Sequence, residues 1–210
     1  MTANNGQPRW FFYLGWVVLN FIAIVMAWYI AWALISPITS IVGGTIQVRG
    51  QSRITDDDMF LNVLLPTIGL LTGILQYTLL RRYLPHMAWW IAATFLGWLM
   101  PFATVYLLLT VLELGNDTFS IMVGMFLIGA TVAVPQWWML RKRVRYASWW
   151  ILAYGFGWSV TGLSSLVRLD NLFPVLLAFA LMLAIATGFA CWLLLDWLPK
   201  NELKSGAPSY

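Results

Sequence analysis

The chain has 210 residues, of which 61% are hydrophobic and only 10% are charged. Soluble domains carry about 25% charged residues, so this composition excludes soluble globular, disordered and fibrous proteins and leaves an integral membrane protein. The single cysteine excludes a disulfide framework, and the single histidine excludes a histidine cluster for a metal or haem. The basic residues lie in short loops beside apolar runs, which favours membrane orientation over nucleic-acid binding.

Six apolar runs are long enough to cross a bilayer as helices, for which about 20 residues are needed. In chain order they are residues 10–35, 59–80, 88–110, 119–140, 147–167 and 172–198. The sequence therefore predicts one domain over residues 1–210, an all-α integral membrane bundle of six transmembrane helices. The only sizeable loop is 36–58, on the external side, and its rough alternation over residues 45–55 favours a short β-hairpin.

The basic residues predict the orientation of these spans. On the side of the N-terminus lie nine: Arg9, Arg81, Arg82, Arg141, Lys142, Arg143, Arg145, Lys200 and Lys204. On the other side lie three: Arg49, Arg53 and Arg168. Because cytoplasmic loops are enriched in Lys and Arg, we expect both termini in the cytoplasm. The cluster expected to bind anionic lipid headgroups is Arg81, Arg82, Arg141, Lys142, Arg143 and Arg145.

The most specific feature is an internal repeat, in which residues about 62–108 recur at about 122–168 with a constant offset of 60 and no gap. The matched pairs include Gln76 and Gln136, Arg81 and Arg141, Trp89-Trp90-Ile91 and Trp149-Trp150-Ile151, and Gly97-Trp98 and Gly157-Trp158. Each unit is a helical hairpin that turns on the cytoplasmic side, so the repeat is parallel. The first and sixth spans have the directions of a third, permuted pair, with Gly15-Trp16 as the match to Gly97-Trp98.

Small residues four apart recur within the repeat, where they would let helix backbones approach closely in lipid. The predicted packing positions are Gly69, Gly73, Ala93, Gly97, Gly129, Ala133, Ala153 and Gly157. Similar stripes in the first and sixth spans predict that all six helices form one compact bundle.

Gln76 and Gln136 lie about one helical turn before the basic loops. One interpretation is that each amide forms an interhelical hydrogen bond or extends toward the headgroups. The alternative is that the two amides face each other and bind a polar ligand. Ten of the 14 tryptophans lie toward the cytoplasmic end, which is typical of an aromatic belt at headgroup level. The alternative is a surface for quinones, pigments or partner helices. His86, whose repeat partner is Tyr146, is the candidate ligand for a pigment magnesium.

No acid or base lies at the middle of any predicted span, whereas ion pumps and proton relays need such residues. No catalytic, metal or phosphate-binding motif is present. We therefore expect no enzyme and no cofactor, and instead an accessory or scaffold subunit of a larger respiratory or photosynthetic membrane complex. The alternatives are a small transporter or channel for a neutral or lipid-like solute, and a pigment- or quinone-binding protein.

The repeated pattern Gln-[Trp/Tyr]-x-x-Leu-Arg, followed by Trp-Trp and then Gly-Trp, resembles uncharacterised multi-pass membrane proteins of photosynthetic and related filamentous bacteria. The resemblance covers roughly residues 62–168. It implies a six-helix architecture and a bacterial inner membrane, and it carries no activity.

Overall fold

Helices form wherever the sequence has long apolar runs, because a helix satisfies all its backbone groups internally. The computed structural model describes residues 9–42, 45–48, 51–82, 84, 87–107, 117–144, 146–162 and 172–196. The helices are α1 (Arg9–Val42), α2 (Thr55–Leu80), α3 (Trp90–Leu107), α4 (Thr118–Leu140), α5 (Trp149–Gly162) and α6 (Leu172–Asp196), and the strands are β1 (Thr45–Val48) and β2 (Gln51–Ile54). The described chain is thus helical apart from one short hairpin.

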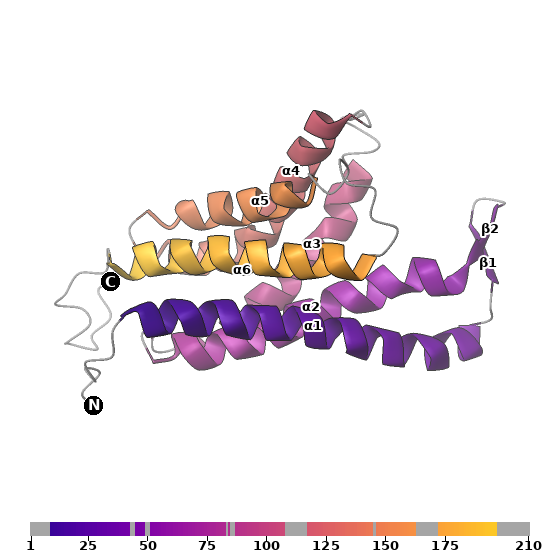
Figure 1. The fold of residues 1–210 in the computed structure, drawn as a ribbon, viewed down its shortest axis with the longest axis horizontal. Coiled ribbons are helices and arrows are strands. Elements are labelled where there is room, and N and C mark those ends of the chain that lie inside the picture. Colours follow the sequence, from indigo (N-terminus) through magenta and orange to yellow (C-terminus); the bar gives the residue numbers. More distant parts are fainter. Residues whose placement is uncertain are drawn as a thin grey trace.

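The six helices close into a ring. Each packs against the next along the chain, and α6 returns to pack against α1 (Figure 1). The marked N- and C-termini lie at one end of the long axis, and β1 and β2 lie at the other. This arrangement gives α1, α3 and α5 one direction and α2, α4 and α6 the opposite one.

Among the described residues, four helices are long and apolar enough to cross a membrane: Trp10–Ile41, Phe60–Leu80, Thr118–Leu140 and Leu176–Leu193. They belong to α1, α2, α4 and α6. A shorter apolar stretch, Trp90–Val105, makes up most of α3. The described part of α5 has 14 residues.

The predicted external loop 36–58 is wrong in extent. Helix α1 continues through Pro37 to Val42, and α2 already begins at Thr55. Pro37 therefore lies inside α1. A proline is tolerated within an apolar helix where neighbouring groups satisfy the backbone carbonyl that it leaves free. The predicted β-hairpin is confirmed, with Thr45 opposite Ile54 in antiparallel register.

The small residues predicted to pack lie at helix contacts. A Cβ at Gly69 would stand 2.8 Å from the Cβ of Trp98, and one at Gly129 would stand 2.6 Å from that of Trp158. These two contacts are related by the offset of 60. A Cβ at Gly97 would overlap the Val132 carbonyl oxygen. Gly73, Ala93, Ala133 and Gly157 are buried as well, whereas Ala153 is half-buried.

Candidate functional site

Gln76 is the centre of a hydrogen-bonded contact between α1, α2 and α3. Its side chain is only 1% exposed. The Trp90 indole Nε1 of α3 donates to Gln76 Oε1 over 2.9 Å. Gln76 Nε2 in turn donates to Asn20 Oδ1 of α1 over 2.7 Å. The amide therefore uses both its oxygen and its nitrogen on neighbouring helices.

Gln136 repeats this arrangement one hairpin later. Its side chain is fully buried. Trp150 Nε1 of α5 donates to Gln136 Oε1 over 2.7 Å, and Gln136 Nε2 donates to Thr94 Oγ1 of α3 over 2.8 Å. The tryptophan again follows the glutamine by 14 residues. The offset of 60 found in the sequence thus also relates two sets of core contacts.

Helices α6 and α1 hold a related pair. Trp16 Nε1 of α1 donates to Thr187 Oγ1 of α6 over 3.1 Å. Asn20 Nδ2 donates to the Trp16 carbonyl over 2.8 Å, just as Thr94 Oγ1 donates to the Trp90 carbonyl over 2.8 Å. By these contacts Trp16 corresponds to Trp90. The sequence match of Gly15-Trp16 to Gly97-Trp98 therefore differs from this correspondence by eight residues, or about two helical turns.

Tyr154 of α5 joins the two glutamines. It is 2% exposed, and its hydroxyl lies within reach of the side chains of both Gln76 and Gln136. Tyr154 is therefore a neighbour common to the two amides. Both amides therefore bond to side chains of the protein itself.

Three indoles, one from each of α1, α3 and α5, fill the centre at the same level. The Trp150 ring lies 5.7 Å from that of Trp16 and 5.8 Å from that of Trp90, both edge-on. We call the hydrogen-bonded side chains around these indoles the polar layer. It consists of Trp16, Asn20, Gln76, Trp90, Thr94, Gln136, Trp150, Tyr154 and Thr187.

The polar layer links all six helices and is closed to solvent. Its least buried members are Asn20, which is 6% exposed, and Tyr154. In a medium of low dielectric such bonds are strong, and a partner that lost its bond would remain buried and unsatisfied. The hydrogen bonds of this layer therefore hold the helices in register.

Above the polar layer the core is closed by aromatic rings. Trp98 and Trp158 lie 5.5 Å apart, and Phe179 of α6 lies 4.9 Å from Trp158 and 6.5 Å from Trp98. Trp98 is 1% exposed and Trp158 is 9% exposed. Side chains therefore fill the centre of the ring both at the polar layer and at the level of Trp98 and Trp158.

The predicted aromatic belt is only partly right, because Trp16, Trp90 and Trp150 were assigned to it and lie in the core instead. The reason is chemical: each indole N–H finds a buried acceptor, which a headgroup would otherwise supply. Four described tryptophans of the cytoplasmic set are exposed: Trp10, Trp89, Trp138 and Trp149. These four side chains agree with an aromatic belt at headgroup level.

The basic cluster is exposed as far as the structure describes it, at Arg81, Arg82, Arg141, Lys142 and Arg143. The Arg141 guanidinium lies 3.4 Å from the Trp138 ring centroid and 5.2 Å from that of Trp137, in a cation–π arrangement. Arg145 and His86 lie outside the described residues.

Within the described ranges, no group of three or more His, Cys, Asp or Glu could hold a metal ion. Cys191, the one cysteine, is buried in α6. Comparison with protein-family models, with curated proteins and with solved structures gives no match. The function must therefore be inferred from the chain itself.

Proposed function

We propose that all six helices cross the membrane as three parallel hairpins, α2–α3, α4–α5 and the permuted pair α6–α1. In each hairpin one tryptophan donates to a side chain of the partner helix, which supports this division. The pairs are Trp90 with Gln76, Trp150 with Gln136 and Trp16 with Thr187. The positions seven and three residues before Gln76, Gln136 and Thr187 support it too, because they are all glycine or alanine. They are Gly69 and Gly73, Gly129 and Ala133, and Ala180 and Ala184.

We further propose that the protein is a non-catalytic accessory or scaffold subunit of a larger membrane complex. The observation that carries this proposal is the buried, mutually bonded polar layer. Gln76 and Gln136 are the side chains that a polar ligand would need, and the oxygen and nitrogen of both amides are already bonded to neighbouring helices. A rigid core of this kind suits a protein that works through its outer surface.

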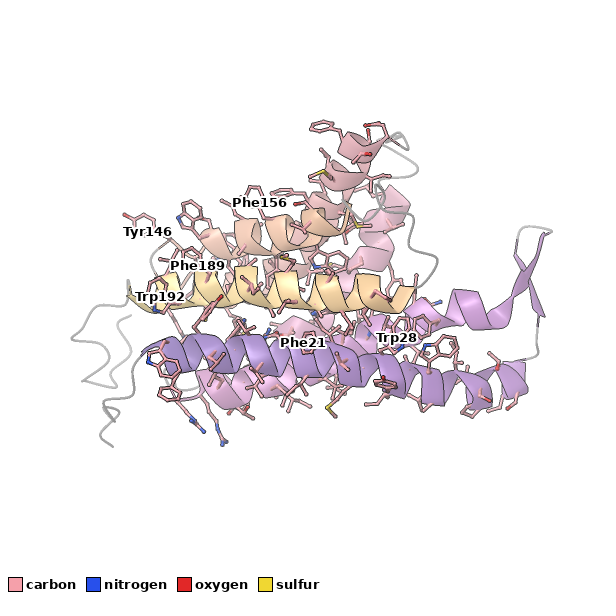
Figure 2. All side chains as sticks on the ribbon, in the orientation of Figure 1. Phe21, Trp28, Tyr146, Phe156, Phe189 and Trp192 are labelled. Carbon is pink, nitrogen blue, oxygen red and sulfur yellow. The ribbon has the colours of Figure 1, made fainter. Side chains whose placement is uncertain are left out.

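The outer surface is apolar and rich in aromatic side chains. Phe156 of α5 is 60% exposed and Phe189 of α6 is 51% exposed (Figure 2). Lipid tails or the helices of another membrane subunit can cover such side chains. We expect this surface to hold the partner subunits.

The orientation follows from the charges. Arg81 and Arg82 directly follow the end of α2, and Arg141 directly follows the end of α4. Helix α1 starts and α6 ends at this same end of the ring (Figure 1). The positive-inside rule then places this end in the cytoplasm. With the resemblance to bacterial multi-pass proteins, this supports a location in an inner membrane.

Purification in mild detergent, followed by quantitative mass spectrometry and an absorption spectrum, tests the role. We expect the same membrane subunits to co-purify in constant ratio with the tagged protein. An isolated, colourless protein that moves a neutral solute across liposomes would overturn the scaffold role. A bound chromophore in an otherwise isolated protein would instead assign a pigment- or quinone-binding role.

A further inference from the structure

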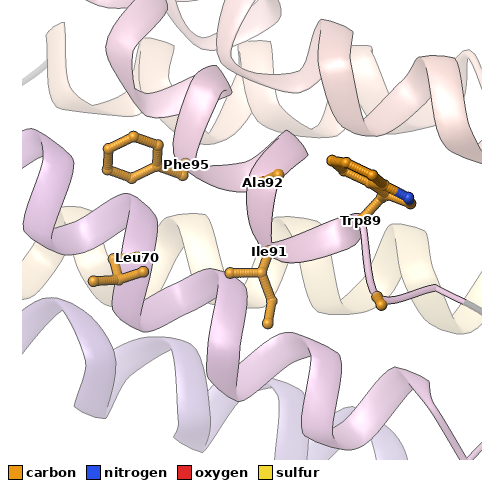
Figure 3. Close-up of a pocket in the computed structure, with 6 residues that line it drawn as sticks. Leu70, Trp89, Ile91, Ala92 and Phe95 are labelled. Atoms are coloured by element: carbon orange, nitrogen blue, oxygen red, sulfur yellow. The ribbon is translucent and has the colours of Figure 1, made fainter.

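A shallow groove of about 510 Å³ runs along the outer surface between α2 and the start of α3 (Figure 3). It is lined by Leu70, Ala88, Trp89, Ile91, Ala92 and Phe95. Trp89 lies at one end, and Leu70 and Phe95 lie toward the other. Since the indole N–H is the only polar side-chain group among these residues, the groove suits a hydrocarbon chain.

One small residue of the first hairpin, Ala92, leaves this space open. Ala92 corresponds by the offset of 60 to Leu152, which would fill the groove. Phe95 corresponds to Gly155, and there the ring of Phe126 covers the backbone, 2.6 Å from where a Cβ would stand. The two hairpins therefore share their core contacts but differ at this outer surface.

The groove opens at the basic end of the ring. Ala88 and Trp89 belong to the turn that follows Arg81 and Arg82, and both arginines are exposed. Trp89 is 76% exposed, as expected for an indole at headgroup level. Two adjacent guanidinium groups supply the planar, charged donors that bind a phosphate oxygen pair well.

We propose that this groove binds one acyl chain of an anionic phospholipid whose phosphate is held by Arg81 and Arg82. The apolar lining accounts for the chain, and the charge complementarity accounts for the headgroup. Basic sites between helices on the cytoplasmic side are a recognised form of lipid binding. The proposal rests on the membrane location proposed above and is independent of the scaffold role.

Native mass spectrometry of the whole protein, released from nanodiscs of phosphatidylcholine with a minor fraction of phosphatidylglycerol, tests it. We expect one retained phosphatidylglycerol per wild-type protein. Ala92→Leu introduces the residue of the second hairpin and should lower its occupancy at least tenfold. Arg81→Gln with Arg82→Gln should remove the preference for phosphatidylglycerol over phosphatidylcholine. Undiminished occupancy in Ala92→Leu, or an unchanged preference in the double variant, overturns the proposal.

Two changes outside the groove serve as controls. Leu152→Phe alters the matched position of the second hairpin, and Arg53→Gln removes a positive charge in β2, at the opposite end of the ring. Both should leave the retained lipid unchanged. Loss of the lipid in either control would show that binding depends on general charge or folding, and it would overturn the assignment to this groove. Retained lipid without partner subunits would contradict only the scaffold role, whereas partner subunits without retained lipid would contradict only the lipid site.

Discussion

Trp16 and Thr187 are separated by 171 positions in the chain, and the indole of the first donates to the hydroxyl of the second over 3.1 Å. This bond joins α1 to α6 and so closes the ring of helices. It occupies the place that Trp90 and Gln76 fill in the first hairpin and that Trp150 and Gln136 fill in the second. An indole N–H thus donates to a side-chain oxygen at three positions around one core.

Replacing Thr187 tests whether this bond stabilises the closed ring. Thr187→Val keeps the shape but removes the acceptor, so the Trp16 N–H is left buried without a partner. We expect a loss of about 1–2 kcal/mol in the free energy of unfolding, measured in mixed detergent micelles. Thr187→Ser retains the hydroxyl and should lose clearly less. Equal losses in the two variants would contradict a role for the hydrogen bond.

The glutamine contacts should be coupled more strongly within a hairpin than across hairpins. Gln76→Leu and Gln136→Leu should each cost about 1–2 kcal/mol, because each removes interhelical bonds from the buried core. A double-mutant cycle of Gln76→Leu with Trp90→Phe isolates their bond. We expect a coupling energy clearly different from zero for this pair. The cycle of Gln76→Leu with Trp150→Phe should give a smaller coupling energy, because these two residues belong to different hairpins. Similar values in both cycles would argue against paired contacts.

Gly97 marks the closest approach between α3 and α4. In Gly97→Ala the new methyl group would overlap the Val132 carbonyl oxygen, and backbone cannot move aside cheaply. We expect overpacking of about 1–3 kcal/mol and a lower Tm in detergent. Gly15→Ala is the matched control, because its nearest neighbour is the Leu79 side chain at 3.7 Å. A Tm of Gly97→Ala at or above that of Gly15→Ala would disprove the packing role.

Asp117 gives the start of α4 a dependence on pH. Its carboxylate accepts from the Ser120 hydroxyl over 2.5 Å and from the Ser120 backbone N–H over 3.0 Å. These bonds lower the pKa of Asp117 in the folded protein. The stabilisation is therefore present above the ordinary pKa of about 4 and is lost as the pH falls through the lowered value. Thermal unfolding of Asp117→Asn should show a smaller decrease in Tm between pH 6 and pH 3 than the wild type.

The sequence was sufficient for the helices, because apolar runs of this length have few other structures. It was also sufficient for the β-hairpin and for the equivalence of Gln76 with Gln136. The extent of the external loop could not be predicted, because α1 continues through Pro37, whose local preference to end a helix is overridden in an apolar environment.

The depth of the tryptophans could not be predicted from position along the chain. Trp89 and Trp90 are neighbours, yet one is 76% exposed and the other 1% exposed. Their difference depends on which face of α3 turns toward Gln76, and that is a property of the assembled ring. The contribution of Tyr154 was missed for the same reason: only the packing of α5 between α4 and α6 in the ring turns this side chain toward both glutamines.

The bond between Trp16 and Thr187 also sets the order of events during synthesis. At a translation rate of about 5–20 residues per second, the 171 residues between them take roughly 10–30 s to make. During that interval α1 is already made while the acceptor of its indole does not yet exist. Every earlier intermediate is an open arc with two unpaired helix edges. A chain truncated before Thr187 would lack the acceptor of the Trp16 indole, and its helices could not close the ring through this bond.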